Sequence, residues 1–153
     1  MLIRRSLVGF NVIFVTLLCV LVGCGKEDQT AKKVVEVDES LCQFSQGPCQ
    51  QQIGELTVSL ELTPTHAPSE KPIHLIVRTN HIVDQIDMQV KGRDMFMGII
   101  PVNLQQQAKD VYQGELIYGS CSSNYMVWRA QVNVTTQGQT MSFWFDFLAD
   151  NPL

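Results

Sequence analysis

Apolar and polar residues alternate with a period of two along most of the chain after residue 53. Leu56, Val58, Leu60 and Leu62, for example, are separated by single polar residues. This alternation is typical of β-strands that have one buried and one solvated face. It predicts seven strands, near residues 56–62, 73–77, 86–90, 95–104, 112–118, 126–134 and 141–147.

Short strands separated by turn signals predict an all-β fold. The architecture expected is an immunoglobulin-like antiparallel β-sandwich of about seven strands, which follows a signal peptide and a short tether. Residues 136–139 are a predicted hairpin turn between the last two strands. The pattern also predicts a buried core that includes Leu56, Leu60, Val77, Trp128, Val132, Phe143 and Phe145.

The N-terminus has the features of a secretory signal. A short basic start is followed by an apolar stretch, residues 7–22, that is shorter than the roughly 20 residues of a membrane-spanning helix. The stretch ends in Leu21-Val22-Gly23-Cys24, which resembles the lipobox of bacterial lipoproteins. Three segments are therefore predicted: a lipoprotein signal peptide (1–23), a lipidated N-terminus with its tether (24–40) and a β-sandwich domain (41–153).

The lipobox resemblance implies that Cys24 becomes the acylated N-terminus once residues 1–23 are removed. Two or three acyl chains hold a protein on a membrane essentially permanently. Gly25, rather than Asp, follows the cysteine, which resembles lipoproteins of the outer membrane. The predicted location is thus the cell envelope, with a lipid anchor in the outer membrane facing the periplasm. The alternatives are an uncleaved membrane anchor and, at residues 34–37, a first edge strand.

Charge limits the class of partner. The whole chain has a formal net charge of −4, and loss of residues 1–23 leaves nine basic and fifteen acidic residues, a net charge of −6. Nucleic-acid binding needs Lys and Arg to replace counterions, so nucleic acid is not an expected partner. The expected partners are a membrane, through the lipid anchor, and a protein of the envelope.

Five cysteines are present, of which Cys19 lies in the predicted signal peptide and Cys24 is the lipid acceptor that the lipobox resemblance implies. A disulfide between Cys42 and Cys49 is favoured, because Gly-Pro between them turns the chain back. The alternative is a disulfide between Cys121 and one of these two. The sequence has no CxxC motif, so a thioredoxin-like redox role has no support.

No catalytic motif is visible. The sequence lacks GxSxG, HExxH, a P-loop and GxGxxG. His66, His74 and His81 lie in or near the first strands and turns, and a catalytic triad that includes one of them could assemble only in space. The acidic residues are scattered over polar strand faces, so we interpret them as solvated surface groups. The protein is not expected to be an enzyme.

One group of residues suggests a metal. Met95, Met97, Cys121 and Met126 offer soft sulfur ligands of the kind that Cu(I) prefers. Met95 and Met97 are two apart, so on a strand they would share one face. The competing interpretation is that the methionines fill the core and that Cys121 is in a disulfide.

Residues 86–134 resemble small periplasmic sandwich domains of the FixH and YtkA-like kind. The shared features are Met95-x-Met97-Gly98, Tyr112-Gln113-Gly114, and Gly119 or Cys121 before Met126-x-Trp128. The resemblance implies an envelope accessory protein that handles copper during cytochrome oxidase assembly. The chain differs from FixH itself, which has a membrane-spanning helix and no lipobox. It also lacks the histidine-rich stretch of many copper carriers.

Two functions follow as hypotheses. The first is a lipid-anchored interaction module without catalytic activity or cofactor. Its contact residues would be apolar side chains on polar strand faces, namely Ile76, Ile117 and Trp144. The alternative is the copper-handling accessory protein, with Cu(I) as the bound ion.

Overall fold

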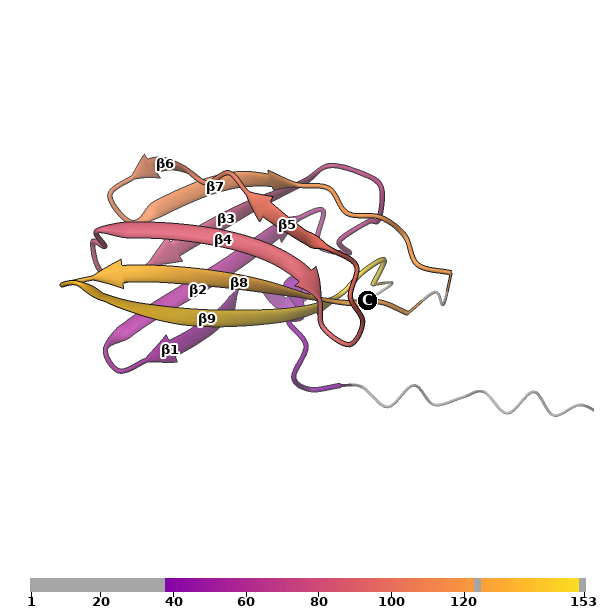
Figure 1. Ribbon diagram of the computed structural model, residues 1–153, viewed down its shortest axis with the longest axis horizontal. Coiled ribbons are helices and arrows are strands. Elements are labelled where there is room, and N and C mark those ends of the chain that lie inside the picture. Colours follow the sequence, from indigo (N-terminus) through magenta and orange to yellow (C-terminus); the bar gives the residue numbers. More distant parts are fainter. Residues whose placement is uncertain (1–37, 123–124, 152–153) are drawn as a thin grey trace, which may run out of the picture. The chain divides into compact units, whose positions relative to one another are not determined.

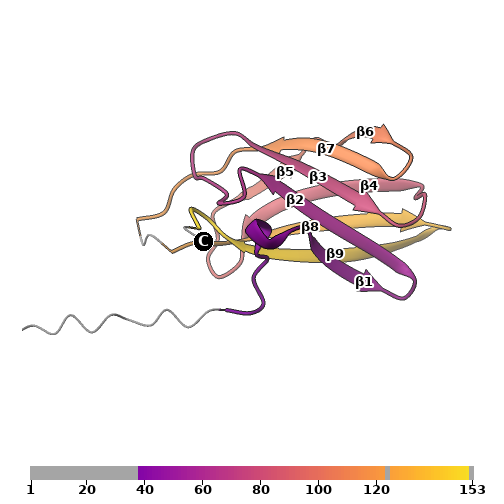
Figure 2. The ribbon, with the colours of Figure 1, turned by 180° about the vertical axis from the view of Figure 1, so that it is seen from behind.

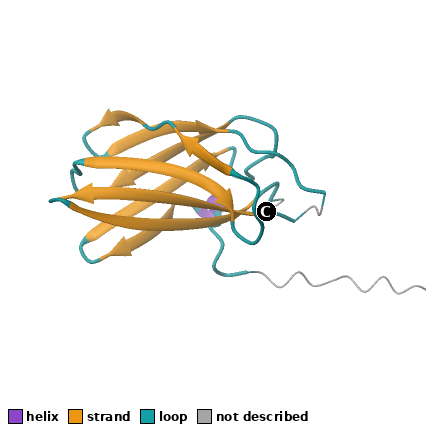
Figure 3. Ribbon diagram, viewed as in Figure 1, coloured by secondary structure: helices purple, strands orange, loops and turns teal. Residues whose placement is uncertain are grey.

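β-Strands make up nearly all the regular structure in the computed structural model, which describes residues 38–122 and 125–151 (Figures 1 and 3). The described residues belong to a compact unit, Val37–Leu153. The predicted signal peptide, Cys24 and the tether up to residue 37 lie outside them. The described elements are the 3-10 helix η2 (Phe44–Gln46) and the strands β1 (Cys49–Ile53), β2 (Leu56–Thr63), β3 (Ile73–Thr79), β4 (Gln85–Gly92), β5 (Ile99–Val102), β6 (Gln105–Ala108), β7 (Val111–Leu116), β8 (Val127–Thr136) and β9 (Gln139–Leu148).

The strands form two antiparallel sheets that pack face to face. One sheet has the order β5-β4-β8-β9 and faces the viewer in Figure 1, and the other has the order β1-β2-β3-β7-β6 and is seen in Figure 2. In immunoglobulin nomenclature, β2 to β9 correspond in chain order to strands A, B, C, C′, D, E, F and G. The sheet that contains β2 then has the order A-B-E-D after β1, and the other sheet has the order C′-C-F-G. This is the immunoglobulin arrangement, with β1 added beside β2. The prediction of an immunoglobulin-like β-sandwich is confirmed.

The core lies between the inward faces of the two sheets. Every second residue of β2, β3, β8 and β9 is buried over most of each strand. All seven residues predicted to be buried are at most 5% exposed. Burial of each large apolar side chain contributes on the order of 2–3 kcal/mol before conformational entropy is counted. Tyr118 stacks on Trp128, with 4.7 Å between their ring centroids.

A two-residue turn joins β8 to β9 as predicted. Gln137 and Gly138 have φ angles of 52° and 75°, the left-handed pair that a type I′ turn requires. The turn sets the register in which Trp128 pairs with Phe147, Ala130 with Phe145 and so on along the hairpin. All the aromatic residues of β9 except Trp144 therefore point into the core.

The sequence pattern does not predict β1 or β6. Both strands contain consecutive glutamines, and both are edge strands of the same sheet. The predicted strand at residues 95–104 is wrong at both ends, because residues 95–98 form a loop and β5 is confined to Ile99–Val102.

The predicted disulfide between Cys42 and Cys49 is present, with 5.4 Å between the two Cα atoms. It connects the segment before η2 to the first residue of β1. A closed loop of this length stabilises a fold by about 2–3 kcal/mol on the loop-entropy model. Within the described ranges, no helix has the length and apolar character needed to cross a bilayer.

Candidate functional site

One end of the sandwich holds the point at which the described chain begins. We call it the tether end, and among the described residues it comprises residues 38–41, the β2–β3 loop, the β4–β5 loop and residues 117–122 and 125–126 between β7 and β8 (Figures 1 and 2). The β8–β9 turn and the β1–β2 turn lie at the opposite end. The loops of the tether end bond to one another. The amide of Glu70 in the β2–β3 loop, for example, donates to the carbonyl oxygen of Tyr118 in the β7–β8 connection over 2.8 Å.

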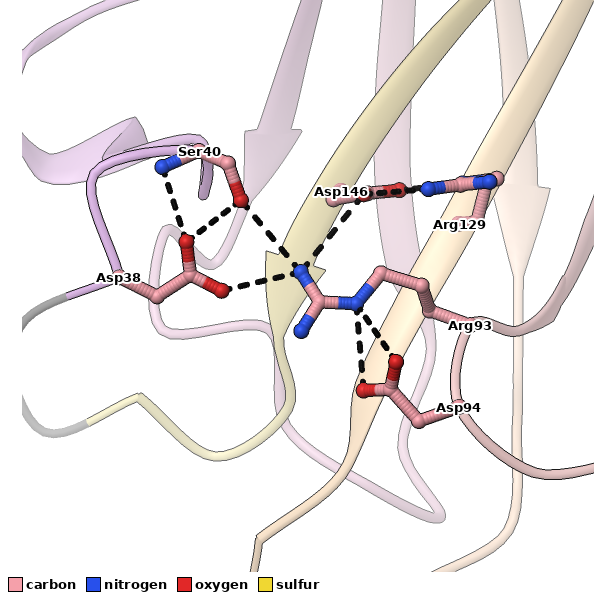
Figure 4. A network of polar contacts seen from close by, with 6 residues as sticks. All are labelled: Asp38, Ser40, Arg93, Asp94, Arg129 and Asp146. Carbon is pink, nitrogen blue, oxygen red and sulfur yellow. Dashed lines mark hydrogen bonds and ion pairs between the residues drawn. The ribbon is translucent and has the colours of Figure 1, made fainter.

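Arg93, the first residue after β4, links three acidic residues at the tether end (Figure 4). Its Nη1 lies 3.0 Å from Oδ2 of Asp38 and 3.7 Å from Oδ2 of Asp146. Its Nε donates to Oδ1 of Asp94 over 3.0 Å. The side chain is only 19% exposed. The hydrogen bond to Asp94, followed by that to Asp38, raises the pKa of Arg93 further above its usual value, so the guanidinium stays charged.

Asp38 anchors the incoming chain. The amide of Ser40 donates to Oδ1 of Asp38 over 3.0 Å, and the Ser40 hydroxyl donates to the same oxygen over 2.5 Å. The bond from the Ser40 hydroxyl, then the bond from Arg93, then the bond from the Ser40 amide hold the pKa of Asp38 below its usual 3.8. Because folding lowers this carboxyl pKa, the contact contributes its stabilisation fully at pH values above the unfolded-state pKa of 3.8. The contribution is lost as the pH falls through the folded-state pKa.

The next residues of the chain continue along β9. The amide of Cys42 donates to the carbonyl oxygen of Asp146 over 2.7 Å, and Leu41 forms a parallel bridge with the same residue. Asp38 and Ser40, at the end of the predicted tether, are thus bonded to Arg93 through their side chains, and Leu41 and Cys42 are paired with β9 through the backbone.

Asp146 also pairs with Arg129, its cross-strand neighbour on β8. Nε and Nη2 of Arg129 donate to the two carboxylate oxygens over 2.7 and 2.8 Å, which is the two-pronged geometry of strong Arg–carboxylate pairs. The pair raises the pKa of Arg129. The guanidinium also lies 5.6 Å from the ring centroid of Trp144, within cation–π range.

A row of amide side chains extends this polar surface along the outer face of β4, β8 and β9. Gln89 donates to Gln131, and Gln131 donates to Asn133, over 3.2 and 3.1 Å. Asn133 then donates to Asp87 over 2.8 Å and accepts from Ser142 over 2.7 Å. Trp144, 55% exposed, stands beside this row, because its β8 partner is Gln131. The face therefore offers one large aromatic ring among hydrogen-bonding groups.

The β4–β5 loop is apolar and exposed. Met95, Phe96 and Met97 are all exposed large hydrophobic residues, and Phe96 is 85% exposed. Gly98, with φ of 83°, turns the chain into β5, and Ile99 at its start is exposed as well. The prediction that Met95 and Met97 share a strand face is wrong, since both residues lie in this loop.

The four predicted copper ligands all come from the tether end, but they differ in exposure. Met126 is buried, and its Cε lies 2.7 Å from the point where a Cβ of Gly92 would stand. The carbonyl oxygen of Met95 lies beside the same point, so Met126 packs against the root of the β4–β5 loop. Cys121, in the β7–β8 connection, is partly buried against the core.

The three predicted contact residues do not form one patch. Ile76 is half-buried on β3, where it pairs with Glu61 and Gln113. Trp144 lies on the outer face of the other sheet. Ile117 is exposed in the β7–β8 connection at the tether end.

The end of the sandwich opposite the tether end has an open cavity of about 590 Å³. Ile53, His81, Ile82 and Met141 are among the residues that line it. His74 lies elsewhere, on β3 beside Glu115 at 3.8 Å, and His66 is in the β2–β3 loop. The three histidines are thus distributed over different parts of the fold. Among residues 38–122 and 125–151, no group of three or more His, Cys, Asp or Glu side chains is placed to hold a metal ion.

Sequence reasoning missed four site residues, namely Asp38, Arg93, Arg129 and Asp146. Asp146 stands between two inward-pointing phenylalanines and Arg129 between Trp128 and Ala130, so strand alternation already places both charges on the outer face. The strand pattern, combined with the predicted turn, therefore contained the information needed to place Arg129 and Asp146 opposite each other.

Comparison with known proteins gives distant similarities. No protein-family model matches the sequence, and no match is found among curated proteins. A DUF4785 family protein from Legionella pneumophila aligns with a TM-score of 0.47 and 11% identity, over 64% of this chain and 29% of that one. The GAE domain of GGA2p from Saccharomyces cerevisiae aligns with a TM-score of 0.36 and 11% identity, over 67% of this chain and 96% of that one. This chain thus spans under a third of the Legionella protein.

The Arg129–Asp146 pair is expected to stabilise the sandwich measurably. In Arg129→Met the Asp146 carboxylate, 12% exposed, loses two charged hydrogen bonds, so the free energy of unfolding should fall by about 1.5–3 kcal/mol. Urea unfolding followed by fluorescence measures the change. Arg78→Met is the matched control, because the Arg78–Glu61 pair is more exposed and has a single contact of 3.2 Å, which predicts a loss of about 0–1 kcal/mol. Equal losses in both variants would contradict the prediction.

Proposed function

We propose that the protein is a lipid-anchored β-sandwich of the bacterial cell envelope, which binds another envelope protein and has no catalytic activity. The observation that carries the proposal is the order of three parts along the chain. A lipobox-like Leu21-Val22-Gly23-Cys24 is followed by a polar spacer, residues 25–37, and then by a sandwich whose first described residue, Asp38, is paired with Arg93. An acyl anchor, a polar spacer and a folded domain in this order are what a domain held at a membrane surface requires.

Two observations support export and anchoring. The Cys42–Cys49 disulfide belongs to an oxidising compartment such as the periplasm. Gly25 after the lipid-acceptor cysteine supports the outer membrane, facing the periplasm, as the place of the anchor. The acyl chains of Cys24 would then attach the domain to the membrane without a spanning helix.

The outer face of β4, β8 and β9 is the proposed protein-binding surface. Trp and Arg are the residue types most enriched at the centres of protein interfaces, and Trp144 and Arg129 lie together on this face. The amide row beside them supplies hydrogen-bonding groups across a broad strand surface. Such a surface suits a macromolecular partner better than a small substrate, which needs a concave pocket.

The lipid anchor predicts a specific dependence on Cys24. In Cys24→Ser the thiol that accepts the diacylglyceryl group is gone, so the chain should keep residues 1–23 and have no acyl chains. Intact-mass measurement of the protein purified from membranes detects both changes. Cys19→Ser is the matched control, since Cys19 lies in the same segment outside the lipobox and its loss should leave processing unchanged. A Cys24→Ser chain with the wild-type mature mass and membrane retention would contradict the proposal.

The binding face predicts where a partner touches the domain. A photo-crosslinking amino acid placed at Trp144 should give a discrete crosslinked band in intact cells, because the residue lies at the centre of the proposed surface. The same amino acid at Ile76, on the outer face of the other sheet, is the control and should give no such band. Gel mobility and peptide mass analysis read the result. The same band from both positions, or none from position 144 in a correctly acylated chain, would count against this surface.

Copper handling is a second candidate, favoured by one observation. The buried Met126 packs against the root of the loop that carries Met95 and Met97, so three sulfur-bearing residues belong to one end of the fold. Thioethers are soft ligands suited to Cu(I). With Cys121 from the β7–β8 connection, they are the proposed ligands in this alternative, which is an accessory role in cytochrome oxidase assembly.

A competition titration with a colorimetric Cu(I) chelator tests the alternative. We expect one equivalent of Cu(I) per chain, with affinity reduced about tenfold or more in Met97→Leu, Met126→Leu or Cys121→Ser, since each removes a soft ligand. Met88→Leu is the matched control, because Met88 is a buried methionine of β4 outside the proposed set. Absence of binding by the wild-type chain, or an equal loss in Met88→Leu, would exclude the site.

A further inference from the structure

We propose that the apolar tip of the β4–β5 loop, formed by Met95, Phe96, Met97 and Ile99, inserts into the lipid bilayer that carries the acyl anchor. The inference rests on the proposed anchor at Cys24. It goes beyond that proposal, because it gives the folded domain its own contact with the membrane and hence a fixed orientation.

The first support is the composition and exposure of the tip. Four of the five residues from Met95 to Ile99 are large and apolar, the fifth is Gly98, and none carries a charge. Phe96 is the most exposed of the large hydrophobic residues described, at 85%. Single exposed apolar residues are ordinary, but a contiguous exposed group marks an interaction site with a protein or a membrane.

The second support is the position of the loop beside the start of the domain. Arg93, two residues before Met95, is bonded to Asp38 over 3.0 Å, and Asp38 is the first described residue (Figure 4). Thirteen residues separate Asp38 from Cys24, and such a segment spans at most about 50 Å when fully extended. The anchor therefore keeps the loop near the bilayer, so that even a weak insertion becomes an intramolecular step with a high effective concentration.

Charge decides which lipid the contact suits. The chain after residue 23 is acidic, with a net charge of −6, and the tip has no cationic group to attract an anionic headgroup. The inferred contact is therefore apolar, is formed with zwitterionic lipid, and survives raised salt, which screens exposed charges only. Phe96 has no metal-ligating atom, so a test at this position does not depend on copper.

Depth-dependent fluorescence quenching tests the inference in the full acylated chain. Phe96→Trp is made in a Trp144→Phe background, and the protein is reconstituted in phosphatidylcholine vesicles with or without brominated acyl chains. We expect the indole at position 96 to lose about half of its emission in brominated vesicles and to emit at shorter wavelength, as an interfacial aromatic side chain does. Raised salt should leave both effects unchanged. The buried Trp128 is present in every variant, and its emission shows whether the fold is intact.

Ile82→Trp in the same background is the matched control. Ile82 is 65% exposed in the β3–β4 loop and lines the cavity at the opposite end, so its indole should escape quenching. Equal quenching at both positions, or none at position 96 in a chain whose mass shows acylation, would overturn the inference and leave the lipid anchor standing. A blue shift at position 96 that rises with protein concentration, without quenching, would assign the tip to contact between copies and also overturn it. A chain without acyl chains would refute the anchor itself.

Discussion

The register of the β8–β9 hairpin is the constraint on which the rest of the structure depends. The turn at Gln137-Gly138 pairs Thr136 with Gln139, and every later pair along both ten-residue strands follows from it. In this register Phe143, Phe145 and Phe147 all face inward. A shift by one residue would bring these three rings to solvent. The same register places Arg129 opposite Asp146, and through Asp146 it fixes where Arg93 and the incoming chain attach.

Much of this could be predicted from the sequence, because burial leaves a strong alternating pattern. The inward residues of β2, β3, β8 and β9, and the turn between β8 and β9, are all visible in that pattern. Even the Arg129–Asp146 pair is implied, because a two-residue turn at 137–138 makes these two outward residues cross-strand partners. Arg93 and Asp38 could not be found in this way. They are 55 positions apart in a loop and an N-terminal segment, where no strand register relates them.

The missed and mistaken elements have a common physical cause. β1 and β6 are edge strands with exposed side chains, so their backbone hydrogen bonds form without any buried face to leave an apolar period. Residues 95–98 show the converse, because they are apolar and yet form an exposed loop. Hydropathy reports a strand only where apolar residues are buried on folding. An apolar run that stays exposed, such as residues 95–98, does not contribute to the core and instead indicates a surface that contacts another molecule.

The contact between Asp38 and Arg93 would relate the proposed lipid anchor to the orientation of the domain. Because the strands run between the two ends of the sandwich (Figure 1), a β4–β5 tip resting on a bilayer would leave the Trp144 face and the distant cavity open to the aqueous side. The ion pair at the root of that loop joins Asp38, the first described residue, to the residue that precedes the tip by two positions. The bonds from Ser40 and Arg93 hold the pKa of Asp38 below 3.8, so this coupling persists at neutral and mildly acidic pH. The orientation of the binding face would then follow from the membrane contact, with the tether setting only its distance.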